Sequence, residues 1–552
     1  MFTPLRVVYS PIRRFSGPIT SKSNSLDSLI SNLAKTHVIE SGGKGSVVVE
    51  KLIDEKRASA IDRLDYIIKL PTLVSKQQLN RILDDSFASD FSSISFHESN
   101  LIIAIDKMCK LRAIDTQTYR ALMTALASTN LSLLRNASMC TLVEVVATNE
   151  ETKAIDNDQW RRDAMNIVAE TIKKSTTHTD LIFALRRTSL WKNECIQAIK
   201  DNFKSMIFAD KVSLLHTLSQ RDDVDALFIN TMVEEIASDL TPLTPRQCVN
   251  LASTCISLKL NSNRLKTKLI SETMAGMGSM TKWNDVRTII TLFTIWKVTD
   301  DDVWKQLGVW TGRRAKDAPF KDVSAVVNLM GGLGRSEGST IASILSKRMC
   351  LEKGGNALAW LNTIVSLSFY DYIDHRSIES VLDHIFIQDV LSHSSGMRAV
   401  ILRLLLQVDY YASTLEYSGP RLSSSLLTEE DRECIISSYY SSTLEVEAFR
   451  TCLSRVIVDP SLCRTQVHPS GLTIEAHFNN SKGGEESVVF VPSDRCANDG
   501  NGERMMGSNL LSISCMQKKG IKVHTFTYRE MQSFSSQVEA TMFIKKKIFV
   551  SR

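Results

Sequence analysis

Apolar segments typical of amphipathic helices recur along most of the chain, and this recurrence constrains the fold more than any other feature. Successive segments begin 33 to 41 residues apart. Each is followed by a polar turn and a second amphipathic stretch, as Lys259–Asn263 and Leu265–Met274 illustrate. This spacing is the length of a helix–turn–helix repeat. The segments are Leu101–Ile103, Leu142–Val146, Leu181–Leu185, Leu214–Leu218, Leu251–Ser253, Ile289–Phe293, Val326–Met330 and Leu361–Val365.

A single helix pair of this kind cannot bury its own apolar face, so neighbouring pairs must stack into a continuous core. We therefore expect a mostly α fold, with an α-α helical-repeat solenoid over residues 51–455. The spacing is too irregular for tetratricopeptide repeats, and the aromatic and proline signature of that family is not in register. The alternative is a non-repetitive helical domain whose helices have this average spacing.

The pattern changes from helical periodicity to strand alternation near the end of the chain. Ser487–Val491 reads as a strand, Ser508–Lys519 as a helix and Ile521–Phe526 as a second strand, with Gly520 ending the helix. A parallel return between two strands needs a crossover helix. The sequence therefore predicts a small α/β module, which we place at residues 456–552.

The order of residues in this module resembles the RAP domain, an RNA-binding module abundant in apicomplexans and found in organellar proteins of other lineages. The match covers about a seventh of the chain. Degenerate helical repeats also accompany RAP domains in organelle proteins, so the resemblance implies RNA binding for the whole chain. The matching parts are Val491–Asp494, Leu510–Met516, Lys519–Val523, Tyr528–Met531 and the final helix.

The resemblance also implies a restriction-endonuclease-like fold, in which carboxylates and a lysine on adjacent strands hold a divalent ion. The positions where that arrangement would sit, Val489–Val491, are apolar. Pro492–Asp494 stands where the RAP pattern usually has Asp-Gly-Pro. We therefore predict no catalytic residue, no metal and no cofactor, and we interpret Glu475 and Asp494 as surface acids beside a turn.

The first 26 residues hold four cations and no acid, which is the composition of a mitochondrial transit peptide. Arg13–Ser16 resembles a matrix-protease site, and we expect cleavage after Phe15. Residues 1–15 would then be the transit peptide and residues 16–50 a flexible lead, with the mitochondrial matrix as the location. An ordinary basic, disordered terminus is the alternative. No apolar run approaches the roughly 18 residues of a membrane helix, so no membrane insertion is expected.

Charge and cysteine content limit what the chain can bind. The formal net charge is +5, and cleavage after Phe15 would remove three arginines. A strongly basic protein would show its affinity for nucleic acid in its composition, so any RNA site must be a local patch. The 11 cysteines are scattered without a Cys-x-x-Cys pair, which argues against a metal site.

Cations and aromatic side chains suited to RNA gather in the module and in the repeats. Cations hold phosphates while aromatic rings stack on unpaired bases. Cations at a fixed position of each repeat would form a stripe along one surface. We interpret Phe526 as a core residue, and Lys545–Lys547 as a basic end. The predicted RNA-binding residues are Lys518, Lys519, Lys522, His524, Tyr528 and Arg529 in the module, and Arg186, Arg187, Lys192, Lys259, Arg264, Lys266, Lys268, Arg313, Arg314 and Lys316 in the repeats.

These observations predict a mitochondrial protein that binds single-stranded organellar transcripts or ribosomal RNA and is not an enzyme. By resemblance, its task would be RNA stability, processing, translation or ribosome assembly. Mitochondrial ribosomal proteins or other RNA-binding proteins are further expected partners. The alternative is a non-catalytic scaffold or structural subunit of a mitochondrial ribonucleoprotein such as the ribosome, and the third option is a metal-dependent RNA nuclease.

Overall fold

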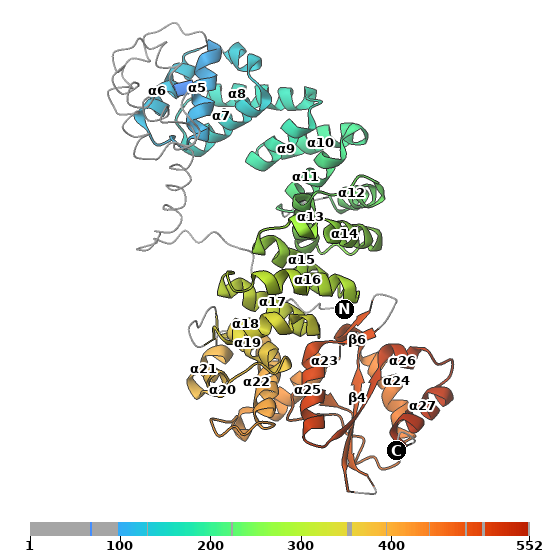
Figure 1. The fold of residues 1–552 in the computed structure, drawn as a ribbon. Coiled ribbons are helices and arrows are strands. Elements are labelled where there is room, and N and C mark those ends of the chain that lie inside the picture. Colours follow the sequence, from blue (N-terminus) through green and yellow to red (C-terminus); the bar gives the residue numbers. More distant parts are fainter. Residues whose placement is uncertain are drawn as a thin grey trace. The chain divides into compact units, whose positions relative to one another are not determined.

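The protein is mostly helical and has a few short strands near its C-terminus (Figure 1). This confirms the coarser part of the predicted fold class. The chain divides into two units, residues 1–205 and 206–552. The predicted transit peptide and flexible lead lie outside the described residues. The computed structural model describes residues 67–68, 98–129, 131–221, 225–349, 356–392, 395–440, 442–480, 483–498 and 503–549.

In the first unit, alternate helices pack on one another. The helices α5, α7 and α9 contact each other in order and contain the first three apolar segments of the recurrence, while α8 contacts α10. Within residues 98–205 as described, the helices of this unit are α5 Glu98–Lys110, α6 Gln117–Ala127, α7 Met139–Thr152, α8 Asp158–Lys174, α9 His178–Arg187 and α10 Lys192–Asn202.

The second unit continues with helix pairs. The helices α11, α13, α15, α17, α19 and α22 stack in that order, and they contain the remaining apolar segments up to Leu361–Val365 (Figure 1). The helices α12, α14, α16 and α18 form a second row beside them. The bounds are α11 Phe208–Leu218, α12 Ala226–Ser238, α13 Pro245–Leu258, α14 Asn263–Gly276, α15 Trp283–Ile295, α16 Asp301–Arg314, α17 Phe320–Gly332, α18 Ser339–Ser346, α19 Ala357–Phe369, α20 His375–Leu382, α21 His384–Ser392, α22 Arg398–Ala412, α23 Glu429–Tyr439 and α24 Thr443–Ser454.

The stacked helices bury apolar side chains in one register. In α15 these are Val286, Ile289, Ile290 and Phe293, which are all fully buried. Their spacing places them on one face of a helix. Four buried positions with the same spacing begin at Cys248 in α13 and at Val323 in α17, and they end at Cys255 and Met330. The shared register is why these helices stack as repeats of one unit.

The turn after four of these stacked helices, α13, α15, α17 and α19, also recurs. Lys259, Lys297, Gly334 and Asp371 all adopt a left-handed backbone, with φ between 50° and 76°. The amide of the next residue donates to the carbonyl five residues before it, as Val298 N does to Phe293 O at 2.9 Å. This is the Schellman geometry that satisfies the last carbonyls of a helix. The array therefore has a helical-repeat-like architecture.

The C-terminal module contains the predicted strand, helix and strand. The strands β4 and β7 pair in parallel, and α25 connects them; β3 pairs antiparallel with β4. Gly520, with φ 84°, ends α25 in the Schellman geometry, with Ile521 N donating to Met516 O at 3.1 Å. The elements are β1 Gln466–Val467, β2 Thr473–Ile474, β3 Ala476–Asn479, β4 Glu485–Val491, β5 Cys496–Asn498, β6 Glu503–Met505, α25 Gly507–Lys518, β7 Lys522–Thr527, α26 Tyr528–Gln532 and α27 Gln537–Phe549.

Helices cover both faces of the three-stranded sheet (Figure 1). On one face, the ring of Phe449 from α24 stacks on Phe490 of β4 at 4.9 Å and lies 5.3 Å from Phe526 of β7. The helix α24 also packs on α27, while α25 lies on the opposite face. The buried Phe526 agrees with its interpretation as a core residue. A boundary at residue 455 therefore separates α24 from the strands on which it packs.

Candidate functional site at the junction of the module and the repeats

The module is joined to the repeats through α25, which packs against α17, α19 and α22. Side chains of α25 are buried around much of its circumference, including Leu511, Ser512 and Met516. A helix buried on all sides lies between two packed layers. Gln407 of α22 strengthens the contact, because its Nε2 donates to the carbonyl of Ser508 at 2.9 Å and to Ser512 Oγ at 3.1 Å.

Glycines allow the start of α25 to approach the end of α17. A β-carbon added to Gly507 would lie only 1.7 Å from the carbonyl oxygen of Gly331. One added to Gly334 would lie 2.9 Å from Leu510 Cδ1 and from the carbonyl oxygen of Met505. The positive end of one helix dipole thereby meets the negative end of another, which is favourable. Any larger residue at Gly507 would force the two helices apart.

Lys518 and Lys519, two of the predicted RNA-binding residues, lie at this junction. Lys518 Nζ is 2.9 Å from Asp371 Oδ1, in the turn after α19, and also 5.6 Å from the ring centre of Tyr411. Lys519 Nζ lies 4.8 Å from the ring centre of Tyr410 in α22. Both lysines therefore help to hold the module against the repeats.

Lys522, His524 and Phe526 share one face of β7, as the predicted alternation requires, but this face is turned toward the module's core. His524 is only 5% exposed. Its Nε2 lies 2.7 Å from Glu486 Oε2, and Asn480 Nδ2 donates to Glu486 Oε1 at 2.8 Å. Although burial opposes it, these hydrogen bonds lower the pKa of Glu486. His524 is thus committed to a buried pair.

Tyr528 and Arg529 follow β7 at its far end, in α26. Six residues of extended chain separate Tyr528 from Lys522, which is roughly 20 Å at the rise of a strand. The prediction that the module's cations and aromatic rings form one cluster is therefore wrong. Lys522 lies near the junction end of the strand, and Tyr528 and Arg529 belong to a separate surface that includes α27.

The predicted cations of the repeats do not occupy equivalent positions. Arg186 and Arg187 end α9, a stacked helix of the first unit, whereas Arg313 and Arg314 end α16, which lies in the second row. The other predicted cations of the repeats also differ in their positions. Lys192 begins α10, Lys259 lies in the turn after α13, Arg264, Lys266 and Lys268 lie on α14, and Lys316 follows α16. The predicted equivalence is wrong, because the apolar segments alone did not distinguish the two helices of a pair.

Several of these cations have partners within the protein. Arg187 pairs with Glu144 at 2.9 Å and with Glu151 at 2.6 Å. Lys266 Nζ donates to the carbonyl of Trp296 at 3.1 Å, and Lys268 Nζ donates to that of Thr241 at 3.1 Å. Such contacts stabilise helix ends and turns. Arg264, 3.8 Å from Glu234, is exposed, and so are Lys259, Arg313 and Lys316, while Arg314 lies over the ring of Trp310 at 4.5 Å.

Glu475 does not offer a metal ligand. It is 2% exposed, so its interpretation as a surface acid is wrong. Its carboxylate accepts hydrogen bonds from Arg450 Nε at 2.7 Å, Arg450 Nη2 at 3.1 Å and Thr465 Oγ1 at 2.8 Å, and from the hydroxyl of Tyr440. These donors occupy the oxygens that a divalent ion would need. Among the described residues, no group of three or more His, Cys, Asp or Glu side chains could hold a metal ion.

Sequence reasoning missed the residues of the repeats that reach into the module. Lys297 Nζ donates to the carbonyl of Asp494 at 2.6 Å and to that of Cys496 at 3.0 Å. Arg504 of β6 pairs with Asp301 at 2.9 Å, and the buried Arg335 pairs with the same carboxylate at 2.6 Å. These partners lie far apart in the chain, and no local pattern marks them. The only signal was the polar character of the turns.

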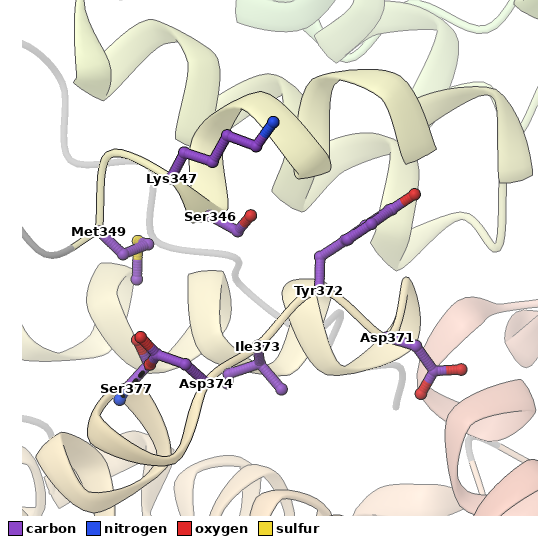
Figure 2. Close-up of a pocket in the computed structure, with 8 residues that line it drawn as sticks. All are labelled: Ser346, Lys347, Met349, Asp371, Tyr372, Ile373, Asp374 and Ser377. Atoms are coloured by element: carbon purple, nitrogen blue, oxygen red, sulfur yellow. Dashed lines mark hydrogen bonds between the residues drawn. The ribbon is translucent and has the colours of Figure 1, made fainter.

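A pocket of about 390 Å³ lies beside the junction, between α18 and α20 (Figure 2). Its polar groups already have structural roles. Asp374 Oδ1 accepts from Ser377 N at 2.7 Å and caps α20, while Asp371 binds Lys518 and the hydroxyl of Tyr411. The pocket therefore lacks a set of convergent polar groups. Its lining is Ser346, Lys347, Met349, Asp371, Tyr372, Ile373, Asp374 and Ser377.

No protein-family model matches the chain, and no curated protein matches it. In the part of the chain that the structure describes, every helix is too short or too polar to cross a membrane.

Proposed function

We propose that the protein binds single-stranded RNA in the mitochondrial matrix, either organellar transcripts or ribosomal RNA, and that it does so without catalysis. Its module would be a RAP-type domain with a restriction-endonuclease-like fold, mounted on an α-solenoid. Its task would be RNA stability, processing, translation or ribosome assembly. Mitochondrial ribosomal proteins or other RNA-binding proteins would be further partners.

The observation that carries the proposal is the parallel unit formed by β4, α25 and β7 at the end of a helical-repeat-like array. The resemblance to RAP domains was based on residues in this segment, and those residues adopt the order of strand, helix and strand. The array of helix pairs is the second feature that the resemblance implied. The two features occur together in one chain.

The α26–α27 surface of the module, defined by Arg529, Lys545 and Lys546, is the part best suited to contact RNA. All three side chains are exposed, and Lys547 joins the two helices through Glu530 at 2.7 Å. This surface lies on the face of the sheet that α24 and α27 cover, away from α25 (Figure 1). Phosphates would contact these cations, and the partly exposed Tyr528 is placed for stacking on a base.

Charge reversal on this surface tests the proposal in the full chain. Lys545→Glu with Lys546→Glu should weaken binding of a single-stranded RNA oligomer and flatten its salt dependence, because about 0.7 counterions are released per phosphate contact. The matched control is Lys173→Glu with Lys174→Glu at the exposed end of α8, which makes the same change in net charge. Equal weakening by both pairs, or none by either, would count against this surface.

A scaffold that binds other proteins is the second candidate function. The observation that favours it is the internal pairing of Arg187, Lys266, Lys268 and Lys518, which reduces the cations available for phosphate. Purification of the protein from mitochondria, with and without ribonuclease, separates the two functions. Partners that survive ribonuclease, together with no recovered RNA, would favour the scaffold.

A nuclease has the least support, because the Glu475 carboxylate is saturated by Arg450, Thr465 and Tyr440. Magnesium-dependent RNA cleavage by the purified chain that Asp494→Ala abolishes would restore this option. We expect no cleavage above that of a blank purification.

A further inference from the structure

Three cations from separate elements converge on the segment that follows the carboxyl end of β4. They are Lys297 from the turn after α15, Arg403 from α22 and Arg495 beside Asp494. Arg495 Nη2 donates to the carbonyl of Ser438 at 2.9 Å, and its guanidinium lies 5.4 Å from the ring centre of Tyr439. We call Lys297, Arg403, Tyr439, Asp494 and Arg495 the junction cluster.

Polar atoms of the junction cluster are buried without partners. Within the described residues, Arg403 Nε, Arg495 Nε, Tyr439 Oη and Asp494 Oδ1 have no hydrogen-bond partner. Almost all buried polar atoms in folded proteins are hydrogen-bonded, and an orphaned one costs free energy. Four such atoms on neighbouring residues therefore mark a place where a polar ligand would bind.

The charge of the cluster is also unbalanced. Burial, together with the nearby charge of Arg495, lowers the pKa of Arg403 to about 9. An arginine side chain stays protonated in proteins, so the unfavourable surroundings act against the stability of the fold. Asp494 is the acid in contact, but its Oδ2 lies 3.9 Å from Arg495 Nε. One carboxylate faces three cations.

Three other arginines of the repeats and of α24 pair with carboxylates. Arg398, on the same helix as Arg403, forms two hydrogen bonds with Asp431 at 2.7 Å and 3.0 Å. Arg335, whose side chain is fully buried, pairs with Asp301. Arg450 pairs with the buried Glu475. Arg403, in contrast to these three arginines, has no carboxylate partner of this kind among the described residues.

We propose that the junction cluster binds a phosphate group. Two guanidinium groups, an ammonium and a phenol supply donors that match phosphate oxygens, and arginine does so with planar, paired donors. The place is also one where ligands bind in parallel α/β units, outside the carboxyl end of a strand. Arg403 and Arg495 are partly exposed as residues, while their Nε atoms are buried. The phosphate belongs either to a nucleic-acid backbone or to a free anion.

Thermal unfolding of the full chain tests the site. If the site takes a free anion, inorganic phosphate should raise Tm by roughly 2 °C compared with chloride at equal ionic strength, because a ligand of the native state stabilises it. Arg403→Leu should abolish this rise and leave Tm in chloride unchanged or higher. The control Arg398→Leu, which breaks a satisfied pair on the same helix, should lower Tm yet keep the rise.

A single-stranded RNA oligomer separates the two sources of phosphate. If the site takes backbone phosphate, Arg403→Leu weakens RNA binding about tenfold and inorganic phosphate has little effect on Tm. If it takes a free anion, RNA affinity changes less than twofold while the rise in Tm is lost. Either result supports the site. A rise in Tm or an RNA affinity that Arg403→Leu leaves intact would overturn it, as would a wild-type chain that responds to neither ligand.

Arg403→Lys keeps the charge and protects the test against misfolding of the leucine variant. It should retain part of the response, because lysine lacks the planar paired donors. If both Arg403→Lys and Arg403→Leu kept the wild-type rise in Tm or the wild-type RNA affinity, the proposal would be contradicted. The phosphate site can hold even if the proposed RNA binding is wrong. In that case phosphate would raise Tm only when Arg403 is present, and no RNA would be bound to the chain in mitochondria.

Discussion

The stacked helices and the junction hold their parts together by different means. The stack from α13 to α19 uses apolar side chains in one register, and its turns share one backbone conformation. The junction uses close backbone contact at Gly507 and buried or bridging charges at Lys297 and Arg335. Apolar packing is non-directional and tolerates exchange of similar side chains. Glycine contacts and buried charges do not, so single substitutions should act most strongly at the junction and in the module.

The largest effect is expected from Gly507→Val, which breaks the junction and leaves the stack intact. Its side chain would meet the backbone of Gly331 and cannot be relieved by rotation. We expect a loss of about 5 kcal/mol or undocking of α25. The control Gly332→Ala, one residue beyond Gly331 and with open space at its β-carbon, should be neutral or stabilising by about 0.5–1 kcal/mol. Hydrogen exchange of α25 and α17 measures both, and unchanged protection in Gly507→Val would contradict the contact.

Glu475→Ala tests the buried charge network within the module. Removing the carboxylate leaves Arg450 and the hydroxyl of Tyr440 without their partner. We expect a loss of about 3 kcal/mol, at the lower end for a broken buried pair because Arg450 is 38% exposed. The control Glu447→Ala, at an exposed site of α24, the helix that contains Arg450, should change stability by less than about 0.5 kcal/mol. Equal effects of the two substitutions in chemical denaturation would refute the network.

The dependence of stability on pH separates charged contacts from the apolar stack. Hydrogen bonds from Arg398 lower the pKa of Asp431 to about 2, although burial opposes this. An unfolded aspartate titrates near 4, so the pair stabilises fully above that pH and loses its contribution as pH falls toward 2. Because Arg398 is 43% exposed, we expect only about 1–2 kcal/mol. Asp431→Asn should reduce the loss of stability between about pH 4 and about pH 2. The same loss as in the wild type would contradict the contribution of the Arg398–Asp431 pair.

The smallest effect is expected from Lys518→Ala at the rim of the junction. Its ion pair with Asp371 is exposed on both sides, so it should contribute about 0.5 kcal/mol or less. Lys518→Glu places a second negative charge beside Asp371 and should destabilise more. A double-mutant cycle with Asp371→Ala isolates the pair, and a coupling above about 1 kcal/mol would show that the rim matters more than its exposure suggests.

The sequence predicted what depends on local periodicity. The apolar segments of the stacked helices, the strands β4 and β7, and the end of α25 at Gly520 follow from side-chain spacing and from a glycine at a helix end. Contacts between distant segments could not be predicted in this way. Nothing near Gly331 or Gly334 in the sequence pointed to Gly507.

The site was predicted least well, because a cation looks the same in sequence whether it faces solvent or a carboxylate. Lys518 and Arg187 have carboxylate partners, and His524 is buried with Glu486. Glu475 lacked any local mark of burial, and its partner Arg450 lies in a helix that the prediction assigned to the repeats. Arg403 lies in an amphipathic helix as many arginines do, and only its neighbours from the segment after β4 and from α23 distinguish it.

Crosslinking the protein to RNA in intact mitochondria, followed by sequencing of the bound RNA, tests the proposed function most directly. We predict reproducible enrichment of defined organellar transcripts or of ribosomal RNA, reduced in the variant with Lys545→Glu and Lys546→Glu. No enriched RNA, with a stable set of protein partners recovered in its place, would contradict RNA binding and favour the scaffold.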